Sequence, residues 1–100
     1  MTNAYEQFNT EDRRLVILRL LDADSGYSMN ASVLQSALES VAAHTVSRDV
    51  VLHDIEWLQE VGLVTREDVG NVVIARLTGR GSDVANGRTT VPGVKRPRPD

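Results

Sequence analysis

The sequence offers few side chains that could catalyse a reaction or hold a metal ion. It has no cysteine, and its two histidines, His44 and His53, lie nine positions apart without a third ligand at metal-site spacing. Asp22 and Asp24 form an acidic pair at an expected helix end, where such side chains are usually only solvated. The glycines on either side of Arg80 lack the spacing and the lysine of a phosphate-binding loop. We therefore expect no enzyme, no metal site and no cofactor.

The polar and basic side chains instead suit recognition of double-stranded DNA. Ser47, Arg48 and His53 lie where a helix is expected to begin, and such side chains can reach base edges in the major groove. Arg66 and Arg76 lie one on each of two expected strands and could contact phosphates or the minor groove. Further basic residues that could bind phosphates follow these strands: Arg80, Arg88, Lys95, Arg96 and Arg98.

The local charge opposes this interpretation. Residues 46–61 contain Arg48 as the single arginine and four acids, Asp49, Asp54, Glu56 and Glu60, and two more acids, Glu67 and Asp68, lie at the expected hairpin tip. Arg48 could equally form an ion pair with an acid. The chain carries a net charge of −3, the sum of an acidic part, residues 1–75, and a basic part, residues 76–100. That basic part could bind phosphates, dock on an acidic protein surface or be merely solvated.

The elements that would position these side chains are those of an α+β domain. Apolar side chains recur at helical spacing over residues 11–22, 31–42 and 46–61, and Thr10 and Asn30 are the expected N-caps of the first two helices. Gly62 is expected to end the third helix in a left-handed conformation. Strands over 63–67 and 72–78 then form a hairpin, and shorter elements are expected at 27–29, a strand, and 83–85, a helical turn.

The first and third helices carry apolar side chains beyond a single stripe. The apolar residues between Leu15 and Leu21 cover more than one face, whereas a surface helix of a monomer shows one apolar stripe. The rest of the domain could cover the second face, but we expect a homodimer in which the first helices pair. Trp57 is expected to be a core or interface anchor, and Leu52, if exposed, would contact a protein rather than DNA.

The end of the chain has a different composition. Residues 88–100 contain three prolines and no amphipathic period, so we expect them to be extended and ordered only by a partner. The predicted domains are thus 1–87 and a basic tail, 88–100. The N-terminus lacks a signal-peptide pattern, and the longest apolar runs are far shorter than the roughly 20 residues of a membrane span. We expect a cytoplasmic protein without a membrane partner.

Taken in order, these features resemble the winged helix-turn-helix superfamily, especially ArsR-like and MarR-like proteins. The resemblance rests on Leu58-Gln59-Glu60-Val61-Gly62-Leu63-Val64 at the end of the third helix and on Leu77-Thr78-Gly79-Arg80-Gly81 after the hairpin, and it covers about residues 10–85. In size and in its tail the chain is also similar to small winged-helix proteins of Mu-like phages and prophages. The resemblance implies three helices, a C-terminal hairpin wing and a DNA-binding, transcription-regulating homodimer. The alternative is an assembly module that binds a phage or host protein without binding DNA.

Overall fold

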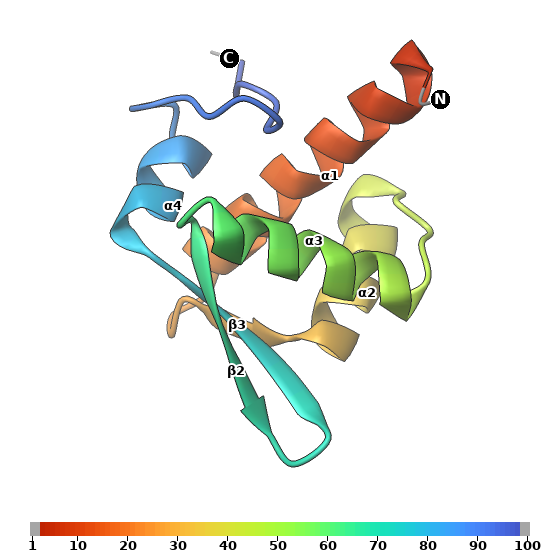
Figure 1. Ribbon diagram of the computed structural model, residues 1–100, viewed down its shortest axis with the longest axis vertical. Coiled ribbons are helices and arrows are strands. Elements are labelled where there is room, and N and C mark those ends of the chain that lie inside the picture. The colour runs from red at the N-terminus through yellow and green to blue at the C-terminus, as the bar shows by residue number, and fades with distance from the viewer. Residues whose placement is uncertain (1–2, 99–100) are drawn as a thin grey trace.

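The computed structural model describes residues 3–98 and shows an α+β domain, as expected. Within that range four helices and a three-stranded antiparallel sheet follow one another in the order α1, β1, α2, α3, β2, β3, α4 (Figure 1). The helices are α1 (Ala4–Ala23), α2 (Ala31–Ala42), α3 (Arg48–Glu60) and α4 (Gly79–Ala85), and the strands are β1 (Ser28–Asn30), β2 (Val64–Val69) and β3 (Val72–Leu77).

Side-chain caps set the beginnings of the helices. The Asn30 and Ser47 side chains accept hydrogen bonds from the backbone N–H groups of Val33 and Val50, which caps α2 as predicted and places Ser47 immediately before α3. The cap expected for α1 at Thr10 is wrong. Asn3 accepts from the Glu6 N–H instead, because no glycine or proline interrupts the residues between this earlier cap and the apolar stretch.

The sheet places β3 between β1 and β2. Arg66 of β2 lies opposite Ala75 of β3, and Thr65 opposite Arg76, so the predicted hairpin is present in this register. Gly62 has a φ of 82°, which is the left-handed conformation expected at the end of α3. In Figure 1 the β2–β3 hairpin extends away from the helices below α3. α4 is longer than the helical turn predicted there and packs against α1.

The hydrophobic core lies between α1, α2, α3 and the inner face of the sheet. Ile17, Leu18 and Leu21 of α1 are fully buried against side chains of the other elements, among them Leu34, Leu38, Ile55 and Leu58. The domain itself therefore covers the second apolar face of α1. Burial of these three residues needs no second chain, so they do not by themselves argue for the predicted homodimer.

The C-terminal segment also packs on the domain, which corrects the expectation that it is ordered only by a partner. Val91 and Val94 are buried in the core cluster, and the Lys95 N–H donates to the Glu11 carbonyl oxygen (3.2 Å). We call residues 91–95 the C-terminal strap. In Figure 1 it lies beside α1, far from the hairpin tip. No helix in residues 3–98 is long and apolar enough to cross a membrane.

Candidate functional site

The exposed side of α3 is the surface that the predicted DNA-contacting residues would use. Val51, Ile55 and Leu58 face the core, whereas Asp49, His53, Glu56 and Glu60, at spacings of four, three and four residues, are all exposed. These four form the outermost stripe of the helix. The stripe contains three acids and no arginine or lysine, so the helix presents negative charge where a DNA-reading helix needs donors and cations.

The three predicted base-contacting residues at the start of α3 are exposed, but two of them already have partners. The Ser47 hydroxyl caps the helix by accepting from the Val50 N–H (3.3 Å). Arg48 lies beside the outer stripe, and its Nη1 donates to the Ser32 hydroxyl of α2 (2.9 Å). Of the three predicted residues, only His53 lies on the stripe itself.

The two predicted arginines of the hairpin lie on opposite faces. Arg66 is opposite Ala75 in the register and Arg76 is one residue further along β3, so their side chains alternate across the sheet. Arg66 Nε donates to Asp68 Oδ1 (2.8 Å), and this hydrogen bond lowers the pKa of Asp68. Arg76 Nη2 lies 4.0 Å from Glu67 Oε1. Each arginine thus has an acid of β2 beside it, and the two cannot contact one phosphate backbone from the same face.

The other predicted phosphate-binding residues do not lie along the exposed side of α3. Arg88 pairs with Asp83 (2.8 Å), Lys95 pairs with Asp12 (3.1 Å), and Arg80 donates to the Val61 carbonyl oxygen (3.0 Å). Arg96 and Arg98 form no ion pair with another described residue and lie beside Asn86 and Gly87 at the end of the chain. The predicted basic residues therefore do not make one continuous surface.

The acids, by contrast, gather on α3 and the adjoining strand. We call the exposed acids of α3 and of the sheet face that carries Arg66 the acidic face, which consists of Asp49, Glu56, Glu60 and Asp68; Glu67 lies on the other face of the sheet, with Arg76. Together with the exposed Arg48 and Arg66, these four acids give a net charge of −2, while Glu67 and Arg76 on the other face of the sheet balance each other. α3 packs directly on β2, and the Gln59 side-chain oxygen accepts from the Arg66 N–H (2.7 Å), which fixes the strand against the helix.

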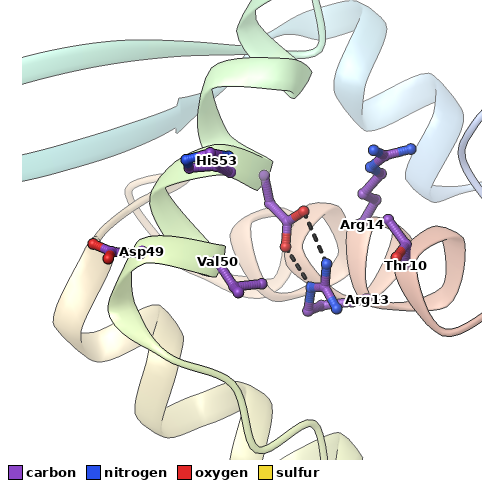
Figure 2. Close-up of a pocket in the computed structure, with 7 residues that line it drawn as sticks. Thr10, Arg13, Arg14, Asp49, Val50 and His53 are labelled. Atoms are coloured by element: carbon purple, nitrogen blue, oxygen red, sulfur yellow. Dashed lines mark hydrogen bonds and ion pairs between the residues drawn. The ribbon is translucent and has the colours of Figure 1, made fainter. Parts of the chain in front are cut away.

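Asp54 does not belong to this surface, although the sequence interpretation counted it there. It is 3% exposed, and both Nε and Nη2 of Arg13 donate to its carboxylate (Figure 2). The pair lies at the side of a cavity of about 360 Å³ between α1 and α3, which Asp49, Val50 and His53 also line (Figure 2). The sequence did contain a signal for this position: Asp54 shares its helical spacing with Val51, Ile55 and Leu58, which lie on the inner side of the helix.

Trp57 and Leu52 contact the domain itself. The Arg14 guanidinium lies 3.8 Å from the centroid of the Trp57 ring, and its Nη1 donates to the Gly93 carbonyl oxygen (2.9 Å). Trp57 is therefore the anchor of the C-terminal strap. Leu52 is half-buried and packs against the core, so it is not the exposed apolar contact that we expected for a protein partner.

Asp12 connects three distant parts of the chain. Its Oδ2 lies 2.7 Å from His44 Nε2 in the α2–α3 connection, and its Oδ1 lies 3.1 Å from Lys95 Nζ in the strap. Burial alone would raise the pKa of Asp12, but the hydrogen bonds and positive charges of His44 and Lys95 outweigh this and lower it. His44 thus serves as a link between helices. Within residues 3–98 no group of three histidines or acids could hold a metal ion.

Comparison with known proteins identifies relatives that match most of the chain. No family model matches it. The chain is 54% identical over 90 residues to the uncharacterized protein gp26 of Escherichia phage Mu, which covers 90% of this chain and 92% of that protein. It is 36% identical over 78 residues to an uncharacterized protein of Haemophilus influenzae, which covers 77% of this chain and 74% of that protein.

Proposed function

The chain belongs to the same family as gp26 of Escherichia phage Mu, and from this premise and the fold we propose a non-enzymatic winged-helix protein of phage or prophage origin that binds another protein. The winged-helix assignment is supported by the order of elements. α2 and α3 are joined by a short connection, α3 is exposed along one side, and an antiparallel hairpin follows it directly.

The charge of the acidic face favours a protein over DNA as the partner. Its four acids outnumber the two arginines beside them, Arg48 and Arg66, and Arg66 already forms an ion pair with Asp68. Proteins bind DNA through cationic side chains that replace the counterions of its phosphates. A surface with a net charge of −2 therefore weakens DNA binding. The same surface attracts a basic segment or surface of a protein. We therefore propose a basic protein surface of the phage or its host as the ligand.

Reversing the charge of the acidic face tests this function. Glu56→Lys with Glu60→Lys changes the outer stripe of α3, while Glu6→Lys with Glu39→Lys makes the same charge change at exposed positions on α1 and α2. In affinity capture from phage-producing host cells with quantitative mass spectrometry, we expect wild type and the control pair to retain the same basic protein. The face variant should lose it at least ten-fold, and high salt should release it.

A partner retained equally by the face variant would exclude the acidic face as its binding site. Duplex DNA binding at low salt, reduced by Arg48→Ala, would instead support the second candidate, a DNA-binding regulator. That candidate is favoured by the exposure of Ser47, Arg48 and His53 at the start of α3 and by the free guanidinium groups of Arg96 and Arg98 among the described residues. Titration of labelled duplex DNA with the wild type and Arg48→Ala distinguishes the two.

A further inference from the structure

The first turns of α1 expose two aromatic side chains that the domain does not use. Tyr5 is 72% exposed and Phe8 51% exposed, and in Figure 1 this end of the helix projects beyond the rest of the molecule. Lys95 Nζ lies over one side of the Phe8 ring, 5.1 Å from its centroid, but more than half of the side chain remains in contact with solvent. Large exposed apolar side chains close together mark an interaction surface.

These aromatics belong to a longer stripe on α1. At 100° per residue, Tyr5, Phe8, Asp12, Val16 and Arg19 lie within an arc of about 80° and extend along the helix for about 21 Å. Val16 is half-buried, and Arg19 is exposed and forms no ion pair with residues 3–98. The stripe therefore carries aromatic rings at one end and an available guanidinium at the other.

We propose that this stripe binds a second copy of the chain, with the two α1 helices antiparallel and crossing at Asp12. A two-fold interface requires a surface that complements itself, and this stripe does so. Antiparallel pairing places Arg19 of one copy over the Tyr5 ring of the other, and Phe8 against Val16. An arginine over an aromatic ring and an apolar pair are both favourable contacts.

Asp12, at the centre of the proposed interface, is also compatible with the pairing of two copies. Two Asp12 carboxylates facing each other would repel, but each is already hydrogen-bonded to His44 and Lys95 of its own chain. Those contacts supply positive charge where the two acids meet. The proposed interface uses the half-buried Val16 but not the fully buried Ile17, Leu18 and Leu21, and it lies outside the acidic face.

Sedimentation equilibrium of the full chain tests the dimer. We expect a reversible dimer whose dissociation constant rises at least ten-fold in Phe8→Ser and in Arg19→Glu. Tyr27→Ser is the matched control, because Tyr27 is 52% exposed, about as much as Phe8, but lies just before β1 and not on the stripe. Since Phe8 and Arg19 are exposed, the variants should retain the wild-type circular dichroism spectrum.

Cysteine cross-linking tests the antiparallel register, since the chain has no cysteine of its own. Under mild oxidation, a mixture of Tyr5→Cys and Arg19→Cys proteins should form a mixed disulfide, while Tyr5→Cys alone should not. A monomer at all concentrations, a dimer unchanged by Phe8→Ser, or a Tyr5→Cys disulfide with itself would each overturn the proposal. A monomer would leave the two aromatics as a surface for a different protein.

Discussion

At the scale of single residues, the decisive feature is the burial of Asp54 with Arg13. A carboxylate on α3 that faced a ligand would contribute to binding, but this one is enclosed by α1 and receives two hydrogen bonds from one guanidinium. Burying an ion pair costs desolvation energy, and the attraction between two well-placed charges only roughly offsets that cost. The pair therefore orients α3 relative to α1 more than it adds to stability, and removing one member leaves a buried charge without a partner.

We therefore predict a strong and specific effect of Asp54→Asn. Its free energy of unfolding should fall by about 3–5 kcal/mol, the typical cost of breaking a buried ion pair by removing one partner. Asp49→Asn, at an exposed position of the same helix, should change it by less than about 0.5 kcal/mol. Urea denaturation followed by circular dichroism measures both. Arg13→Met with Asp54→Leu should be more stable than Asp54→Asn, and equal losses for the two asparagine variants would contradict a buried role.

At the scale of elements, the C-terminal strap holds α1 and α3 together. Its valines enter the core, its Gly93 carbonyl accepts from Arg14, and Arg14 stacks on Trp57 of α3. Gly93 has a φ of 96°, and a Cβ there would lie 2.7 Å from two ring carbons of Trp57. Only glycine allows the strap to approach the indole so closely.

Gly93→Ala should therefore displace the strap. We expect a loss of about 2 kcal/mol or more, because strained backbone and overpacking add together, and a red shift of the fluorescence of Trp57, the only tryptophan. Gly70→Ala is the matched control: its φ is also positive, at 59°, but nothing lies within 4 Å of the added Cβ. It should cost about 1 kcal/mol without a spectral shift. Similar losses and spectra for both variants would show that the Trp57 contact is unimportant.

At the scale of the whole molecule, Asp12 joins α1, the α2–α3 connection and the strap. The lowered pKa of Asp12 means that its ionised form is favoured in the folded state. The resulting stabilisation is complete above the pKa of the unfolded chain, about 3.9, and is lost as the pH falls through the lower folded value. Acid should thus loosen three parts of the molecule through one carboxylate.

Asp12→Asn tests this dependence on pH. At pH 7 we expect its free energy of unfolding to be about 1 kcal/mol lower than that of the wild type, since partly exposed ion pairs contribute little each. The difference should disappear at pH values below the folded pKa of Asp12, where the wild-type carboxyl is also uncharged. Urea denaturation between pH 2 and pH 7 gives this comparison. A difference that stayed constant over the whole range would show that the charge of Asp12 is not responsible.

The sequence by itself determined most of the local structure. The cap at Asn30, the glycine after α3 and the β-branched segments of the hairpin depend only on residues close to them in the sequence, so the helix and strand order of an α+β domain was predictable. The beginning of α1 was not, because Asn3 and Thr10 are both competent caps and the choice depends on the residues between them.

Only the tertiary structure decided which charges are available to a ligand. Arg13 pairs with Asp54 across 41 positions and Lys95 with Asp12 across 83, and no local pattern predicts partners so far apart. The same reason explains why the second face of α1 is buried within one chain and why the strap is ordered. Arg66 and Arg76 face opposite sides because the register of the sheet separates them. Periodicity and capping act over a few neighbouring residues, whereas the charge of a surface depends on which distant segments the fold brings together.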